Sequence, residues 1–166
     1  MVMSRDDETI SRREARENSP LSVPIPPSLA GRVLGLGVDI VSNERVRRML
    51  GRHGERFLRR CFSSSEAEYC RSRRDPVPEL AVRMAAKEAA FKAIGGRRGM
   101  GLGWRCFEVA LDDEGVPFLR LRGAAEARAK KMGVGGVWLS LTHEDEWSGA
   151  VVLLTGGAQG APTRSE

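Results

Sequence analysis

An alanine-rich segment at residues 83–95 constrains the fold of this 166-residue chain more than any other part of its sequence. It reads RMAAKEAAFKAIG, consists mostly of strong helix formers and ends in the stop signal Gly95-Gly96. Because small alanine side chains surround most of such a helix, neighbouring elements can approach it closely. We therefore expect a helix that begins near Glu79 and is largely enclosed by the rest of the protein.

Four charged residues lie on this helix: Arg83, Lys87, Glu88 and Lys92. Glu88 and Lys92 are four residues apart and share one helix face with alanines. Unpaired charge is costly to bury, so these side chains need partners. The ordinary interpretation of this spacing is an ion pair between Glu88 and Lys92 that faces solvent. A functional role for the two residues needs support from other segments of the chain.

Length and composition are those of a globular protein with one hydrophobic core. No apolar run is long enough to span a membrane, and the acidic start of the chain is unlike a signal peptide. The three cysteines, Cys61, Cys70 and Cys106, lack the spacing of metal or redox sites. We expect them to be small core residues of a reduced cytoplasmic protein.

The net charge is +5, and the excess of positive charge lies entirely after residue 33. Seven arginines fall within residues 45–60, and three more fall within residues 71–74. This density favours an acidic partner, either a nucleic acid or an acidic protein. A solvated helix face is the alternative interpretation.

The pattern predicts one domain over residues 31–156, a disordered Pro-rich extension over 1–30 and a flexible tail over 157–166. The elements predicted for the domain are a strand over 33–41, helices over 43–50, 55–61, 63–73 and 79–94, strands over 104–111 and 117–122, a helix over 124–132, and strands over 137–142 and 149–154. Ser63 and Glu66 have capping-box spacing. The predicted fold class is α+β, with helices packed on a mostly antiparallel sheet.

Asp39 lies near the end of one predicted strand, and His143 directly follows another. A carboxylate there is more often a turn acceptor, and a lone histidine is more often structural or exposed. Gly35 and Gly37 before Asp39 permit close backbone approach. Beside His143, the hydroxyl of Ser140 suits a phosphate or a polar cofactor tail.

Asp39 and Glu88 together offer two oxygen ligands. Two carboxylates, completed by substrate phosphates and water, are the usual way in which proteins hold Mg²⁺. Lys92, one helical turn from Glu88, would face the same phosphates. A metal ion and a lysine around a pyrophosphate are what phosphoryl transfer requires.

Three motifs in this order and spacing resemble the holo-[acyl-carrier-protein] synthase family, the small bacterial 4′-phosphopantetheinyl transferases. They are residues 35–40 with Arg45, residues 83–89 with Lys92 and Gly95, and residues 139–143. The similarity covers about residues 33–154 and leaves the first thirty residues unexplained. One departure is the loop over residues 95–103, which lacks the Thr-Gly pair expected in the family.

The resemblance implies a 4′-phosphopantetheinyl transferase-like fold and a Mg²⁺-dependent reaction. The phosphopantetheine arm of coenzyme A would move to a serine of apo acyl carrier protein, releasing 3′,5′-ADP and supporting fatty acid biosynthesis. The family further implies a cytoplasmic homotrimer with active sites shared between subunits, and neither a nucleic acid nor a membrane as partner.

The resemblance also assigns roles to residues of this chain. Asp39 and Glu88 are the implied metal ligands. Glu88 is also a candidate base for the serine proton, directly or through a metal-bound water. Lys92 would neutralise or protonate the leaving phosphate. The implied catalytic residues are thus Glu88, Lys92 and Asp39. The implied coenzyme contacts are Arg83, Lys87, Lys92, Gly95, Ser140 and His143. The implied docking residues for the acidic carrier protein are Arg45, Met49, Arg52, Arg56 and Arg60.

Two other functions remain open at the level of sequence. A nucleic-acid-binding module would explain the arginines, but aromatic residues make up only 5% of the chain and offer few stacking platforms. Such a module would also leave Asp39 and Glu88 without a purpose. A different Mg²⁺-dependent phosphotransfer enzyme is the third interpretation.

Overall fold

The structure, a computed structural model, describes residues 32–157. Its elements in chain order are β1 (Val33–Ser42), α3 (Asn43–Cys61), α4 (Ser64–Arg71), α5 (Val77–Ala93), a 3-10 turn η1 (Trp104–Cys106), β2 (Phe107–Leu111), β3 (Pro117–Leu121), α6 (Ala124–Met132), β4 (Val134–His143) and β5 (Trp147–Gly156). The predicted extension over 1–30 and all but the first residue of the predicted tail lie outside the described residues.

The strands form two sheets, a three-stranded sheet in the order β1-β5-β4 and a β2–β3 hairpin. Every pairing in these two sheets is antiparallel. A turn joins the hairpin strands, and Asp112 closes it by accepting from the backbone N–H of Val116. The α+β prediction is therefore confirmed, with the strands divided between two sheets.

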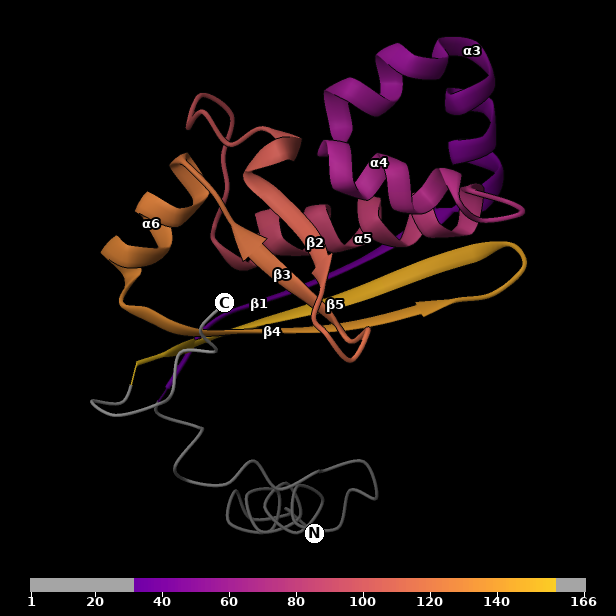
Figure 1. Cartoon of the computed structure of the whole chain (residues 1–166). Coiled ribbons are helices and arrows are strands. Elements are labelled where there is room, and N and C mark those ends of the chain that lie inside the picture. Colours follow the sequence, from indigo (N-terminus) through magenta and orange to yellow (C-terminus); the bar gives the residue numbers. More distant parts are fainter. Residues whose placement is uncertain (1–31, 158–166) are drawn as a thin grey trace, which may run out of the picture. The chain divides into compact units, whose positions relative to one another are not determined.

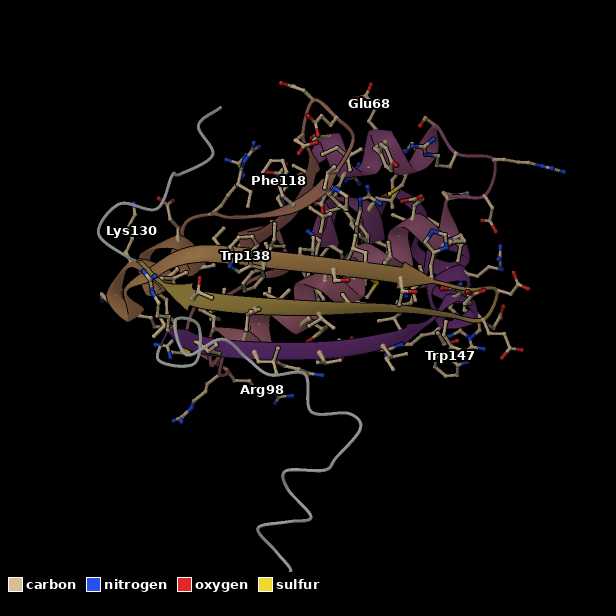
Figure 2. The ribbon with its side chains drawn as sticks, turned by 90° about the horizontal axis from the view of Figure 1, so that it is seen from below. Glu68, Arg98, Phe118, Lys130, Trp138 and Trp147 are labelled. Atoms are coloured by element: carbon tan, nitrogen blue, oxygen red, sulfur yellow. The ribbon has the colours of Figure 1, made fainter. Side chains whose placement is uncertain are left out.

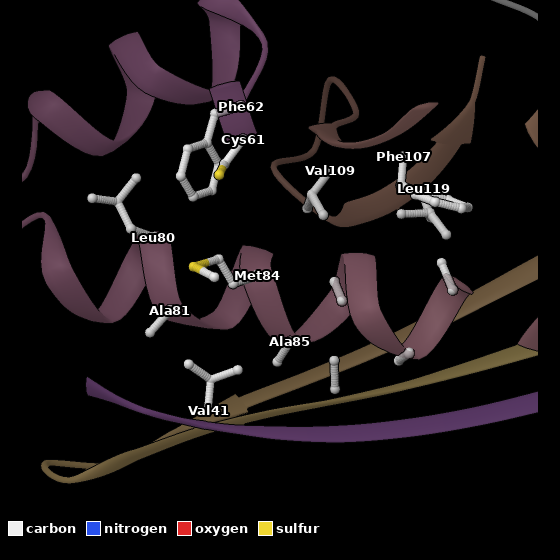
Figure 3. Close-up of a cluster of buried hydrophobic side chains, with 14 of the residues drawn as sticks. Val41, Cys61, Phe62, Leu80, Ala81, Met84, Ala85, Phe107, Val109 and Leu119 are labelled. Atoms are coloured by element: carbon white, nitrogen blue, oxygen red, sulfur yellow. The ribbon is translucent and has the colours of Figure 1, made fainter. Parts of the chain in front are cut away.

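Helix α5 lies at the centre of this arrangement (Figure 1). The three-stranded sheet covers one side of the helix, and α3, α4 and the β2–β3 hairpin lie on the other. Figure 3 shows Ala81 and Ala85 pointing toward Val41 of β1, whereas Leu80 and Met84 point to the opposite side. Twelve of the seventeen residues of α5 are buried, so the prediction of an enclosed helix is confirmed.

The backbone of β1 packs directly on the backbone of α5. A Cβ atom added at Gly37 would lie 1.9 Å from the carbonyl oxygen of Ala89, and one added at Gly35 would lie 2.0 Å from that of Ala93. No side chain fits at either position without moving the strand away from the helix. The predicted close approach is confirmed, and it brings the end of β1 next to α5.

Helix α3 bends sharply in its middle (Figure 1). Gly54 has φ 43° and ψ −124°, a conformation that side chains rarely adopt, and the two predicted helices over 43–50 and 55–61 meet there. The hydroxyl of Ser42 caps the first segment by accepting from the backbone N–H of Arg45. The predicted break is thus a kink within one helix.

Several predicted boundaries were wrong. The strand expected over 104–111 begins only at Phe107, because residues 104–106 form the 3-10 turn η1, from which the carbonyl group of Trp104 accepts from the ammonium of Lys87. Helix α5 begins at Val77 rather than near Glu79. Its N-cap residue is Pro76, Pro78 lies in its first turn, and the otherwise unpaired backbone N–H of Val77 donates to Asp75. Strands β4 and β5 also extend beyond their predicted ends.

None of the helices within residues 32–157 is both long enough and apolar enough to span a bilayer.

We predict that Gly37→Ala lowers the free energy of unfolding by about 3 kcal/mol, because the new methyl group displaces β1 from the Ala89 carbonyl. Gly51→Ala is the matched control. Gly51 is helical, and an added Cβ there meets nothing within 4 Å, so alanine changes stability by about 1 kcal/mol or less, in the stabilising direction. Urea unfolding of both variants measures the difference. Equal stabilities would contradict the close packing.

Candidate active site

Asp39 and Lys92 meet between β1 and α5. The ammonium of Lys92 donates to Asp39 Oδ1 at 2.7 Å and to the carbonyl oxygen of Val38 at 2.9 Å. The Asp39 side chain is 18% exposed and the Lys92 side chain is 52% exposed. The pair is therefore open to a ligand from solvent, at the place where the glycines of β1 bring the strand against the helix.

Glu88, one turn before Lys92 on α5, belongs to the same group of charges. Burial raises the pKa of the Glu88 carboxyl, and the negative charge of Asp39 raises it further. The positive charges of Lys92 and Arg45 act in the opposite direction. The structure thus brings together the predicted residues Asp39, Glu88 and Lys92, and adds Arg45 of α3 at their side.

The donor set of this site fits a magnesium ion. Within residues 32–157 no group of three or more His, Cys, Asp or Glu side chains is arranged to hold a metal. Asp39 and Glu88 provide two carboxylates whose mutual repulsion a cation would relieve. Mg²⁺ is commonly held by one or two carboxylates, with the remaining positions taken by water and substrate phosphates.

A small cavity of about 180 Å³ lies beside Glu88. Its walls come from α5 and from the segment that precedes β2, and the lining residues are Lys87, Glu88, Phe91, Leu102, Gly103, Trp104 and Phe107. The start of the 95–103 loop packs against the same wall, since a Cβ on Gly96 would lie 2.5 Å from the Phe91 ring. Gly95 has φ 65°, which suits glycine at the end of a helix. The acidic site therefore borders a recess with both polar and apolar walls.

Arg83 and Lys87 lie toward α4, away from Asp39. Lys87 is buried, and its ammonium donates to Glu66 Oε2 at 2.9 Å and to the carbonyl groups of Trp104 and Phe107. Arg83 is also buried and donates to Glu79 Oε2 at 2.6 Å. The Lys87 ammonium thus has partners only from within the described residues, and Arg83 is held through its Nη1 while its buried Nε has no hydrogen-bond partner among them.

Glu66 is the partner of the buried Lys87, and the sequence pattern did not predict this pairing. Its capping box with Ser63 is present as predicted. The same carboxylate is also buried, pairs with Lys87 and accepts from the backbone N–H of Val109 on β2 at 3.0 Å. One side chain thus joins α4, α5 and β2. The capping-box spacing signalled Glu66, but nothing local in the sequence signalled its burial.

Ser140 and His143 lie on β4, two strands away from Asp39. Asp39 pairs with Ala150, which pairs with Leu141, so β5 separates β4 from β1 by roughly 10 Å in total. His143 shares the face of Leu141 and is exposed, whereas Ser140 lies on the opposite face. Within one chain, these two residues are not brought together with the carboxylates.

The predicted docking residues lie on α3. Arg45, Arg52, Arg56 and Arg60 are exposed and Met49 is half-buried. Because the charge of Arg45 acts on Glu88, the start of this arginine-rich helix adjoins the acidic site.

This combination of fold and site defines a class of enzyme. Residues 35–152 match the 4′-phosphopantetheinyl transferase superfamily. The chain belongs to this superfamily, as the motifs indicated.

The relatives narrow the class to one kind of transferase. The chain is 42% identical over 122 residues to the holo-[acyl-carrier-protein] synthase of Leptospira biflexa. The aligned residues cover 74% of this chain and 96% of the relative. The fold of this chain is similar to the crystal structure of the synthase from Neisseria meningitidis. The TM-score is 0.67, with 32% identity over 74% of this chain and 98% of that one. The Bacillus anthracis synthase in complex with CoA (3′,5′-ADP) gives a TM-score of 0.63 and 28% identity over 76% of this chain and 99% of that one.

We predict that Lys87 contributes much more than Lys92 to the free energy of unfolding. Lys87→Met leaves Glu66 as an uncompensated buried charge and lowers the free energy of unfolding by about 3–5 kcal/mol. Lys92→Met removes one member of a partly exposed pair and costs about 1 kcal/mol or less. Thermal and urea unfolding of both variants provide the comparison. A Lys92 variant as unstable as the Lys87 variant would contradict this division.

Proposed function

We propose that this protein transfers the 4′-phosphopantetheine arm of coenzyme A to a serine hydroxyl of an apo acyl carrier protein, giving the holo carrier and 3′,5′-ADP. The observation that carries the proposal is the convergence of Asp39, Glu88 and Lys92 from β1 and α5 at one solvent-accessible place. Relatives named holo-[acyl-carrier-protein] synthase, with a coenzyme A complex among their solved structures, support the choice of substrates.

The residues of the site suit each part of this transfer. The serine oxygen attacks the phosphorus that carries the pantetheine arm, and the bond from that phosphorus to the bridging oxygen of the pyrophosphate breaks. Glu88 takes the serine proton, and its raised pKa makes it a stronger base than an ordinary carboxylate. Lys92 neutralises the phosphate of the leaving 3′,5′-ADP. Asp39 holds the Lys92 ammonium in position.

Asp39 and Glu88 would hold the magnesium ion that the family implies. Bound there, the ion would supply positive charge to the pyrophosphate. Gly95, Lys92, Ser140 and His143 are the proposed coenzyme contacts. We omit Arg83 and Lys87 from this set, because their charged groups are enclosed between α4, α5 and the β2 segment.

A homotrimer with shared active sites is part of the proposal. The face of the three-stranded sheet that points away from α5 is strongly apolar (Figure 2). Its exposed residues are Leu34, Leu36, Val38, Ile40, Trp138, Trp147 and Val151. Ile40 is 66% exposed and Trp138 is 61% exposed, which is unusual for side chains of this size on a solvated surface. Ser140 lies on this same face.

The acidic carrier protein is proposed to dock on α3, through Arg45, Met49, Arg52, Arg56 and Arg60. Opposite charges accelerate such an encounter, and salt weakens it. The buried cysteines fit a reducing cytoplasm, where fatty acid biosynthesis would use the product. Burial raises the pKa of the Cys70 thiol to about 11, which keeps it protonated and unreactive.

We predict that Glu88→Gln lowers transfer at least about 100-fold while leaving the fold intact, because the amide cannot take the serine proton. The assay is the intact mass of an apo carrier protein after incubation with coenzyme A and Mg²⁺, together with detection of 3′,5′-ADP. Glu126→Gln is the matched control, since Glu126 is exposed and pairs only with Lys130 on α6. Full activity of Glu88→Gln would remove Glu88 from its role, and an unmodified carrier with wild-type protein would refute the proposed function.

We predict that Val38→Glu dissociates the oligomer, because it places charge in the middle of the apolar sheet face. Val116→Glu is the control, since Val116 is equally exposed, at 48% against 49%, but lies in the turn between β2 and β3. Sedimentation analysis at matched concentrations reads out the mass of each variant. A wild-type protein that sediments as a monomer would exclude the trimer.

A further inference from the structure

Asn43, the first residue of α3, is a buried polar residue that the proposed reaction does not yet use. It is 2% exposed, and every polar atom of its side chain has a partner. Its Oδ1 accepts from the hydroxyl of Ser148, which is itself fully buried, at 2.7 Å.

The other contacts of Asn43 all go to the turn between β4 and β5, about one hundred residues further along the chain. The side-chain amide donates to the carbonyl oxygen of Glu144 at 2.8 Å and to that of Asp145 at 3.2 Å. The backbone N–H of Asn43 donates to the carbonyl oxygen of Glu146 at 2.9 Å. Three successive carbonyl groups of the turn are therefore held by one residue.

The turn has few bonds of its own. The hydrogen bond from the backbone N–H of Glu144 to the carbonyl of Trp147 closes it. The three side chains between His143 and Trp147 are exposed carboxylates that repel one another, which opposes a tight turn. The amide of Asn43 thus supplies donors that the turn itself lacks.

Starting the helix does not require the Asn43 side chain. Ser42 is the N-cap residue, and its hydroxyl accepts from the backbone N–H of Arg45. The Asn43 side chain is directed to the turn instead, and His143 stands immediately before the first carbonyl that it holds.

We infer that Asn43 is a positioning residue for the transfer reaction. It ties the turn that follows His143 to the start of α3, and so fixes the position of the proposed coenzyme contact at the end of β4. This inference rests on the proposed function. Asn43 acts only through His143 and touches no reacting atom.

The test is a double-mutant cycle between Asn43 and His143, with the KM for coenzyme A and the KM for the carrier protein measured separately. Asn43→Asp has the same size, keeps the acceptor for Ser148 and loses both donors to the turn. Each neutral hydrogen bond contributes about 1 kcal/mol, so we expect the KM for coenzyme A to rise about tenfold and the KM for the carrier to change less than about twofold. His143→Ala alone should raise the coenzyme KM by a similar factor.

In the His143→Ala background, Asn43→Asp should raise the KM for coenzyme A by less than about twofold, because its effect depends on the imidazole that this background lacks. Ser148→Ala is the matched control: it breaks the bond to Asn43 Oδ1 but leaves both bonds to the turn, so the coenzyme KM should change less than about twofold. Asn43→Ser, which retains one donor at most, gives an intermediate effect and replaces Asn43→Asp if the latter does not fold.

Independent effects of the two substitutions, an unchanged coenzyme KM, or equal rises in both KM values would each overturn the inference. Wild-type protein without any transfer activity would instead refute the proposed function, so the two failures are distinguishable.

Discussion

The contact between the backbone of β1 and the alanine face of α5 is the constraint on which the rest of the structure depends. Glycines at 35 and 37 let the strand lie against the carbonyl groups of Ala89 and Ala93. A strand held at this distance carries Asp39 to within hydrogen-bonding distance of Lys92. A side chain between strand and helix would separate the two halves of the site.

The same helix divides its charges between two purposes. Lys87 pairs with Glu66 of α4 and so stabilises the packing of α5 on α4, whereas Arg83 pairs with Glu79 one turn earlier on α5 itself. Glu88 and Lys92 lie on the β1 side, where solvent and ligands have access. An alanine-rich helix thus contributes both to the hydrophobic core and to a site where charged groups remain accessible to solvent.

Local patterns predicted most elements because they depend on near neighbours. The capping box at Ser63, the break at Gly54 and the alternation in β4 are examples. Contacts between distant residues could not be predicted in this way. Two examples are the ion pair between Lys87 and Glu66 and the hydrogen bonds from Asn43 to the 144–146 turn. Both depend on how the elements pack, and no residue spacing in the sequence encodes this packing. Period-two alternation, by contrast, already implied that Ser140 and His143 lie on opposite faces of one strand.

The bend in α3 changes the geometry available to a protein partner. On a straight helix, Arg52 and Arg56 would continue a single row of positive charge. Here Gly54 stands between them, so the two segments point along different axes. A complementary acidic protein must place its carboxylates around a corner, and a single straight acidic helix would match only one arm of it. If a carrier protein docks on α3 as proposed, the missing side chain of one glycine would make that docking depend on shape as well as on charge.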